Sequence, residues 1–260
     1  MGGFWLRGAP NARDLGGLTG ADGRRVRAGV LVRAPALGRL TDQDVALLGG
    51  LGLVEVIDLR HPNEIALAPP DRLPAGLTAT HLPVFDPDDE VFTFVAAVML
   101  GQQVPQRPDV GDPVAAMTGV YRWFVTSAAA RAGFGRAVRR IGTAGGQPVL
   151  FHCSAGKDRT GWLAAVLLTA LGVDRATVAA DYLRTNADAR EVTEKVIGAL
   201  TARRGLDPAT VRPVLAAAPE YLDAAYDEVK REYGSFDGYL GEGLGLTGEV
   251  LGDLRASLLE

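Results

Sequence analysis

The most constraining feature of this sequence is a short loop that joins two apolar segments at residues 149–171. Val149–Phe151 is a compact apolar run, typical of a strand buried inside a sheet. The loop 152–161 reads HCSAGKDRTG, and the strongly apolar segment Trp162–Leu171 that follows it predicts a buried helix. A strand that passes through a glycine-containing turn directly into a helix is common in α/β proteins. We therefore expect this class of fold.

The rest of the chain predicts a central, mostly parallel sheet flanked by helices, with a helical C-terminal third. Leu53–Leu59 has the pattern of a strand buried on both faces, Thr78–Val84 fits a second short strand, and residues 11–33 predict a small hairpin. Further helices are expected after the N-cap Thr41, across Val114–Ile141 with a break at Gly133–Gly135, from the N-cap Asp174 to Arg184, over Ala187–Arg204, and from Thr247 to Leu259. We expect residues 1–260 to form a single domain.

Composition excludes several classes of partner. Lys and Arg number 27 against 31 Asp and Glu, and the net charge of −4 argues against a nucleic-acid-binding coat or a polybasic membrane anchor. No apolar run reaches the roughly 18 residues that span a bilayer, so no integral membrane segment is expected. The first residues lack a basic segment followed by an apolar one, which predicts a cytoplasmic protein, with secretion without a cleavable signal as the alternative.

Cysteine and histidine usage limits the chemistry. Cys153 is the single cysteine, so an internal disulfide and a cysteine-rich zinc site are excluded. The three histidines, at positions 61, 81 and 152, do not have the i, i+4 spacing of metal ligands on a helix. We expect chemistry that needs neither a metal nor another cofactor.

The loop 152–161 has the features of an anion-binding site. The small residues Ser154, Ala155 and Gly156 allow successive backbone N–H groups to turn inward, and the N-terminus of the following helix adds roughly half a unit of positive charge. The same field favours a thiolate at Cys153. Arg159 can donate two N–H bonds to a tetrahedral dianion, which Lys cannot do in the same way.

The other loop residues complete a predicted substrate-binding set. The hydroxyl of Thr160 is placed to donate to the thiolate, and His152, which ends the strand, is expected to fix the geometry of the loop. The set is His152, Ser154, Ala155, Gly156, Lys157 and Thr160. A lone cysteine is more often a small buried apolar residue, but Cys153, five residues, Arg159 and Thr160 between an apolar strand and an apolar helix favour a nucleophile. The segment is not a Walker A motif, because Asp158 rather than Ser or Thr follows Lys157.

The loop resembles the signature Cys-X5-Arg-Ser/Thr of the cysteine-dependent protein tyrosine phosphatase superfamily. Its Lys157-Asp158 pair resembles one bacterial branch, the tyrosine/phosphoinositide phosphatases of the mycobacterial protein tyrosine phosphatase B type. Similar segments are NARDLGG at 11–17, GLGLVEVIDLR at 50–60, HLPVFD at 81–86, DYLRTN at 181–186 and EYGSFDGYL at 232–240. The resemblance covers nearly the whole chain except residues 90–113 and implies a tyrosine-phosphatase-like fold.

This resemblance implies a two-step hydrolysis of phosphotyrosine, and also of phosphoserine, phosphothreonine and phosphoinositide monoesters, with inorganic phosphate as product. Cys153 attacks phosphorus, a phosphocysteine forms, and water hydrolyses it. Two aspartates compete as the acid that protonates the leaving oxygen. We favour Asp158, inside the loop, with Asp86 supporting or sharing the step. The structural alternatives are a solvated acidic turn for Asp86 and a salt bridge to Arg13 or another arginine for Asp158.

Other roles follow from the same resemblance. Lys157 is either a solvated side chain or a contact for a second phosphate on an inositol ring. Residues 187–218 are expected to form a helical lid over the pocket, or else an extra helical pair that completes the core. Asn11, Arg13 and Asp14 are expected to brace the active-site region through buried polar contacts. Arg60 is expected at the ligand edge of the sheet.

Two other classes of function stay open at this point. Another enzyme that uses a cysteine thiolate, such as a sulfurtransferase or an arsenate reductase, also places the thiolate on an anion-binding loop. Those reactions usually lack the Arg-Thr-Gly sequence at this spacing or need further cysteines. A non-catalytic phosphate-binding module would not need the thiol of Cys153.

Overall fold

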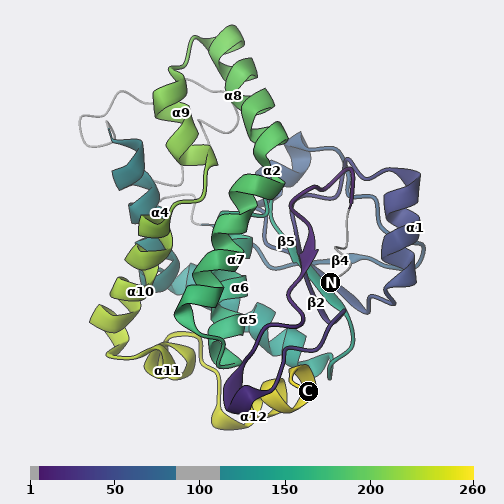
Figure 1. The fold of residues 1–260 in the computed structure, drawn as a ribbon, viewed down its shortest axis with the longest axis vertical. Helices are drawn as coiled ribbons and strands as arrows, with labels where there is room; N and C mark the ends of the chain where they lie inside the picture. The colour runs from purple at the N-terminus through teal and green to yellow at the C-terminus, as the bar shows by residue number, and fades with distance from the viewer. Residues whose placement is uncertain (1–5, 86–111) are drawn as a thin grey trace.

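A computed structural model describes residues 6–85 and 112–260, and within these ranges five strands form one sheet in the order β1-β2-β5-β3-β4 (Figure 1). The strands are β1 (Arg13–Asp14), β2 (Leu31–Ala34), β3 (Glu55–Asp58), β4 (Ala79–His81) and β5 (Val149–His152). β1 pairs with β2 antiparallel, and the three other pairs are parallel. The predicted α/β fold with a mostly parallel sheet is confirmed.

Helices cover both faces of this sheet. They are α1 (Asp42–Gly50), α2 (Pro62–Leu67), α4 (Pro113–Thr126), α5 (Ala128–Thr143), α6 (Asp158–Ala170), α7 (Arg175–Asp188), α8 (Arg190–Arg204), α9 (Pro208–Leu215), α10 (Pro219–Tyr233), α11 (Phe236–Gly238) and α12 (Gly248–Leu258). A 3-10 turn at Ala21–Gly23 and a π-helical turn at Tyr239–Gly243 complete the described elements. In the described ranges, no helix combines the length and apolar character needed to cross a bilayer.

Alternate residues of the central strands point into two separate apolar clusters. Phe151 and Ile57 face the larger cluster, to which α4–α7, α10 and α12 contribute, whereas Leu150 and Val56 face a smaller one closed by α1. Figure 1 shows α1 on one side of the sheet and α4–α7 on the other. The strands are therefore buried on both faces, which explains their nearly continuous apolar sequence.

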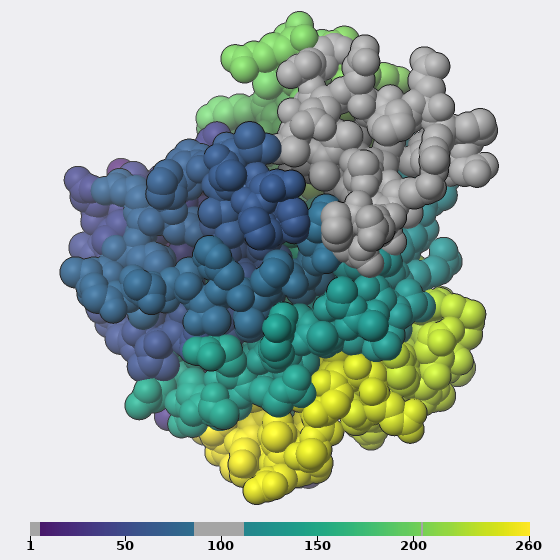
Figure 2. All heavy atoms as spheres, turned by 180° about the vertical axis from the view of Figure 1, so that it is seen from behind, coloured from purple at the N-terminus to yellow at the C-terminus, as the bar shows by residue number. Residues whose placement is uncertain are grey.

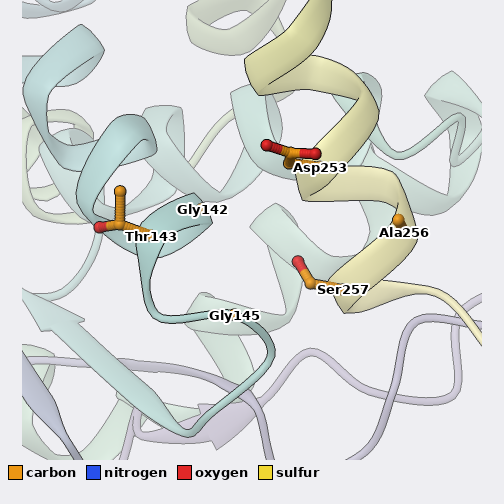
Figure 3. Close-up of a pocket in the computed structure, with 6 residues that line it drawn as sticks. All are labelled: Gly142, Thr143, Gly145, Asp253, Ala256 and Ser257. Atoms are coloured by element: carbon orange, nitrogen blue, oxygen red, sulfur yellow. The ribbon is translucent and has the colours of Figure 1, made fainter.

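The C-terminal residues pair with residues 25–26 at the edge of the molecule formed by α12. Val26 and Leu259 form an antiparallel bridge, and Arg25 and Glu260 exchange two backbone hydrogen bonds of 2.8 Å. Seen from behind, the N-terminal part of the chain fills one side and the C-terminal helices fill the lower edge (Figure 2). A surface hollow of about 520 Å³ lies between the end of α5 and α12, lined by Gly142, Thr143, Gly145, Asp253, Ala256 and Ser257 (Figure 3). None of these residues belongs to the loop 152–161.

The three predicted N-caps, Thr41, Asp174 and Thr247, are confirmed. Thr41 forms a capping box with Asp44, while Asp174 and Thr247 accept hydrogen bonds from Thr177 N and Val250 N. α7 extends past the expected end at Arg184 to Asp188, and α8 starts after a short break at Ala189.

Two further predicted boundaries were wrong, both at glycines that serve packing. The break between α4 and α5 falls at Ser127, not at Gly133–Gly135. A Cβ on Gly133 would lie 2.8 Å from Val84 Cγ2, and one on Gly135 would lie 2.4 Å from Leu244 O. The helix expected from Trp162 already begins at Asp158, and Gly161 lies buried inside it.

Candidate active site

The loop from Cys153 to Lys157 leaves the middle of the sheet at the carboxyl end of β5. His152 pairs with Ala34 of β2 on one side and with Asp58 of β3 on the other. Three parallel strands therefore end together at this loop, the edge where ligands bind in open α/β sheets. Cys153 is 2% exposed and packs within the larger apolar cluster. Arg159 and Thr160 follow in the first turn of α6.

Gly156 lets the loop pass close to the end of β2. Its φ of +66° is in the left-handed region, and a Cβ there would lie 2.6 Å from Pro35 N and 2.7 Å from Ala34 O. Asn11 donates to the carbonyl oxygens of Ala155 and Gly156 at 3.3 and 3.1 Å. In contrast, the backbone N–H groups of residues 154–157 donate to no acceptor in the described part of the chain. An anion above the loop would meet several uncommitted donors and the start of a helix.

A buried charge network holds the loop from behind. Arg13 Nε and Arg33 Nη1 donate to the two oxygens of Asp181 at 2.7 and 2.6 Å, and Arg33 Nη2 donates to Gly156 O at 2.8 Å. Burial and the charge of Arg33 lower the pKa of Arg13 to about 10. Burial raises the pKa of Asp181, but the two arginines outweigh it and hold the pKa below its ordinary value.

The expected bracing role is confirmed for two of its three residues. Arg13 also donates to Asn11 Oδ1 at 2.6 Å, which joins Asn11 to the network. Asp14 instead accepts from Gly16 N and Gly29 N, so it holds the hairpin rather than the loop. Asp181, which sequence reasoning included only within the similar segment DYLRTN, is the acceptor at the centre of this network.

Glu64 is the acidic partner of Arg159, and sequence reasoning missed it. Arg159 Nη1 and Nη2 donate to the two oxygens of Glu64 at 2.6 and 2.7 Å, and Ser154 Oγ donates to Glu64 Oε1 at 2.6 Å. Burial raises the pKa of Glu64, but the positive charge of Arg159 outweighs it and lowers the pKa to about 2. The pair fixes the guanidinium, while Arg159 Nε has no partner among the described residues.

A signal for Glu64 was present in the sequence. Glu64 is the third residue of α2, and its side chain accepts from His61 N at 2.9 Å in a capping box. The sequence His-Pro-Asn-Glu after a strand is typical of such a helix start. The capping function places the carboxylate, and the fold then brings Arg159 to it.

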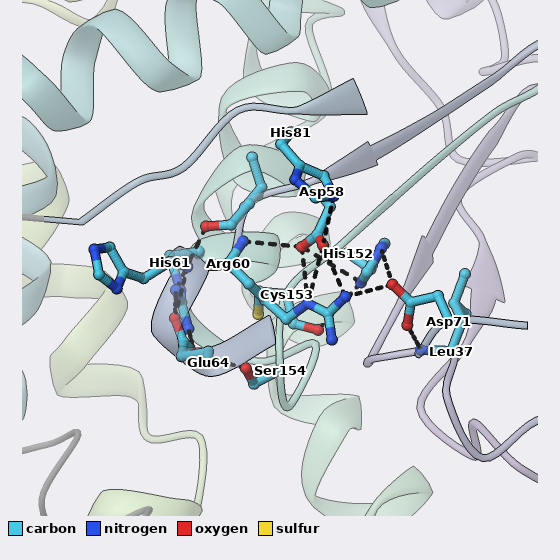
Figure 4. A network of polar contacts seen from close by, with 12 residues as sticks. Leu37, Asp58, Arg60, His61, Glu64, Asp71, His81, His152, Cys153 and Ser154 are labelled. Atoms are coloured by element: carbon cyan, nitrogen blue, oxygen red, sulfur yellow. Dashed lines mark hydrogen bonds and ion pairs between the residues drawn. The ribbon is translucent and has the colours of Figure 1, made fainter. Parts of the chain in front are cut away.

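A second buried network lies at the start of the loop (Figure 4). Arg60 donates to both oxygens of Asp58 and also to Asp71. His152 Nδ1 lies 3.3 Å from Cys153 O, and because a carbonyl only accepts, this nitrogen carries a proton. Burial lowers the pKa of His152. The position of His152 fits its expected role in fixing the loop geometry.

This network corrects the expectation for Arg60. The side chain is 2% exposed and is turned towards Asp58 and Asp71 instead of into the ligand edge. Ligand atoms of Asp58, Asp71 and His152 lie within 4.8 Å of one another, a spacing that suits a metal ion. Arg60 already supplies a cation to both carboxylates, so these residues form a buried ion network.

Lys157 is buried, so the expectation of a solvated side chain was wrong. Its Nζ donates to Val214 O at 2.6 Å and to Ala216 O at 3.0 Å, at the end of α9. The same Nζ lies 3.2 Å from Asp158 Oδ1, which also accepts the hydroxyl of Tyr121 at 3.0 Å. The alternative salt bridge between Asp158 and Arg13 is absent, because Arg13 binds Asp181.

Two predicted site residues remain, Thr160 and Asp86, and the structure describes only Thr160. Thr160 is fully buried, and its Oγ1 has no hydrogen-bond partner within the described ranges. A hydroxyl in that state is available to a group bound in the loop. Asp86 lies outside the described residues.

Comparison with known proteins agrees with this geometry. The Tyrosine phosphatase family matches residues 4–260. The chain is 35% identical to a triple specificity protein phosphatase, PtpB, of Mycobacterium tuberculosis, over 98% of each chain. It is 36% identical to a putative tyrosine-protein phosphatase of Cupriavidus necator, over 90% of this chain and 81% of the relative. A tyrosine-protein phosphatase of Nostoc commune is 32% identical over 60% of this chain and 48% of the relative.

The buried thiol, the uncommitted N–H groups and the Arg159 guanidinium at one strand end define a cysteine-dependent phosphatase site. The family match covers nearly the whole chain, and the chain belongs to the tyrosine phosphatase family. It is therefore a hydrolase of phosphoric monoesters of the tyrosine phosphatase class, as its signature loop predicts.

Proposed function

We propose that this enzyme hydrolyses phosphotyrosine in proteins, and also phosphoserine, phosphothreonine and phosphoinositide monoesters, with Cys153 as nucleophile. The observation that carries the proposal is the loop itself, in which a buried cysteine, four uncommitted N–H groups and a paired guanidinium lie at one strand end. The breadth of substrates is supported by the printed description of the Mycobacterium tuberculosis relative as a triple specificity phosphatase.

The first step forms an S–P bond between Cys153 and phosphorus as the ester P–O bond breaks. Arg159 and the loop N–H groups bind the oxygens of the phosphoryl group and stabilise their charge during transfer. The Thr160 hydroxyl donates to the thiolate. The leaving oxygen takes the proton of the Asp158 carboxylic acid, which leaves Asp158 ionised.

The second step returns the enzyme to its starting state. Water attacks phosphorus and gives a proton to the Asp158 carboxylate while the S–P bond breaks. Inorganic phosphate is released and the Cys153 thiolate is regenerated. Asp158 pairs through Oδ1 with Lys157 Nζ at 3.2 Å, and its side chain keeps 22% exposure at the loop, which leaves the carboxyl group within reach of a leaving oxygen.

We further propose that residues 187–218 form a lid over the loop. α8 and α9 contribute Ile197, Leu200 and Val211 to a small apolar cluster of their own, separate from the two large clusters. An exposed ion pair between Arg212 and Glu194 also joins these two helices. Val214 and Ala217, near the end of the segment, belong instead to the larger cluster, so the part with a core of its own is α8 and the start of α9. Contact with the loop is made through the ammonium of Lys157, so opening would free Lys157 to bind a second phosphate.

The test is turnover of phosphotyrosine, phosphoserine and phosphothreonine peptides and of phosphoinositides, with Cys153→Ser as the matched control. We expect activity on all four substrate types and none in the Cys153→Ser enzyme. Persistent activity in that variant would overturn the mechanism.

The acid is identified by comparing a poor with a good leaving group. Asp158→Asn is expected to lower kcat/KM, which reports the first step, severely for phosphotyrosine and only mildly for p-nitrophenyl phosphate, because p-nitrophenolate leaves without a proton. Asp86→Asn is the comparison variant. Equal, mild losses in both variants would contradict both assignments.

A further inference from the structure

Asp158 is held by one of its two carboxylate oxygens. Oδ1 accepts the hydroxyl of Tyr121 at 3.0 Å and lies 3.2 Å from Lys157 Nζ. In the described ranges, Oδ2 contacts no donor. A carboxylic acid with one oxygen anchored in this way presents the other oxygen, and the proton on it, in a fixed direction.

Two tyrosine hydroxyls form a chain that ends at this carboxylate. Tyr121 and Tyr182 hydroxyl oxygens are 2.7 Å apart. Because Tyr121 gives its single hydroxyl proton to Asp158, Tyr182 must be the donor in the tyrosine pair. Burial raises the pKa of both tyrosines well above the ordinary value, and the charge of Asp158 raises it further, so both keep their protons.

Packing fixes the two rings where the hydroxyls meet. Tyr121, from α4, is fully buried and lies 5.3 Å from the ring of Phe124 and 5.9 Å from that of Tyr221. Tyr182, from α7, lies against α6 at Gly161, where a Cβ would come within 3.1 Å of its ring. Phenylalanine would fill the same space. The hydroxyls therefore need an explanation other than packing.

We propose that Tyr121 is a positioning residue for Asp158, and that Tyr182 in turn donates a hydrogen bond to the Tyr121 hydroxyl. The inference rests on the proposed role of Asp158 as the acid. When Asp158 gives its proton to the leaving oxygen, negative charge develops on the carboxylate, and the O–H of Tyr121 already points at it. A donor that is aligned beforehand stabilises this charge without reorganisation.

The test is the substitution Tyr121→Phe, measured on a phosphotyrosine peptide and on p-nitrophenyl phosphate. We expect kcat/KM on the peptide, which reports the first step, to fall about tenfold, the size of one charge-assisted hydrogen bond. On p-nitrophenyl phosphate the fall should be slight, because that leaving group needs no proton. Tyr182→Phe should change the same ratio in the same direction but less.

The double variant separates positioning from general damage. If Tyr121 acts through Asp158, then Tyr121→Phe combined with Asp158→Asn should be no slower on the peptide than Asp158→Asn alone. The matched control is Tyr226→Phe, which also removes a hydroxyl that lies 2.7 Å from another, that of Thr169 on α6. This control should leave the ratio of the two substrates unchanged.

Three results for the tyrosine variants would overturn the inference. Tyr121→Phe could slow both substrates equally, or its loss of peptide activity could add to that of Asp158→Asn. If Tyr121→Phe does not fold, the third result is a folded Tyr182→Phe enzyme whose ratio of peptide to p-nitrophenyl phosphate activity is unchanged. Equal loss on both substrates in Asp158→Asn would remove the acid assignment and this inference with it. Activity in Cys153→Ser would overturn the proposed function itself, whatever the tyrosine variants do.

Discussion

The two sides of the loop 153–157 are held in different ways. Behind it, Arg13, Arg33 and Asp181 form ion pairs in which both guanidiniums are almost fully buried. In front of it, one ammonium, that of Lys157, bonds to two carbonyl oxygens at the end of α9. Buried ion pairs are costly to break because the remaining charge cannot be solvated. The rear contacts therefore fix the loop as part of the fold, whereas the front contact with the loop is a single ammonium.

The rear network should give the largest effect. Asp181→Asn leaves Arg33 with a buried charge and no carboxylate, and leaves Arg13 with Asp188 alone, at 3.7 Å. We expect the free energy of unfolding to fall by about 3–5 kcal/mol. Urea unfolding followed by circular dichroism measures the change. The control is Asp223→Asn, which breaks an exposed pair with Arg175 and should change stability little. Similar changes in both variants would contradict the proposed difference between the two sides.

Glu64→Gln should have the next largest effect and should depend on pH. The pKa of Glu64 is about 2 in the folded protein and 4.5 ordinarily, so the ion pair stabilises the fold above pH 4.5 and loses this effect as the pH falls towards 2. The difference corresponds to about 3 kcal/mol. We expect the variant to be less stable by about this amount at pH 7, with the gap closing between pH 4.5 and 2. A gap that is constant across this range would show that the charge of Glu64 is not responsible.

The front contact should give the smallest effect on stability and a clear effect on access. Lys157→Met removes the ammonium that holds Val214 O and Ala216 O. We expect a smaller loss of stability than in Asp181→Asn, faster hydrogen exchange in α9, and several-fold faster inactivation by peroxide through oxidation of Cys153. Lys195→Met, which removes an exposed ammonium on α8, is the control. Unchanged hydrogen exchange and unchanged peroxide sensitivity in Lys157→Met would contradict the idea that the Lys157 ammonium holds the end of α9 over the loop.

Local signals explain which features could be predicted from the sequence. The strand at β5, the N-caps Thr41 and Asp174, and the loop signature depend on neighbouring residues, and the structure confirms them as structural features. The partners of Lys157 lie 57 and 59 residues away in the sequence, and Arg13 meets Asp181 across 168 residues. Such contacts are set by the packing of whole helices.

The positions of one glycine and one lysine were predicted wrongly from the sequence. Gly133 predicted a helix break because glycine favours turns, but here the missing side chain admits Val84. Lys157 was expected in solvent because lysine is rarely buried without partners. Two carbonyl oxygens and Asp158 supply those partners, and they come together only in the folded protein.

The short junction between β3 and α2 has a consequence for protein engineering. Asp58 lies beside His152, and Arg60 pairs with Asp58. Glu64, four residues after Arg60, accepts hydrogen bonds from Arg159 and Ser154. A designer who grafts residues 152–161 onto another parallel sheet would transfer the thiol and the guanidinium but leave behind the carboxylate that orients the guanidinium. A transplant therefore needs at least two neighbouring strand ends, 58–64 together with 152–161, carried in parallel register, and a replacement for the contacts of Asn11 and Arg33 with the loop.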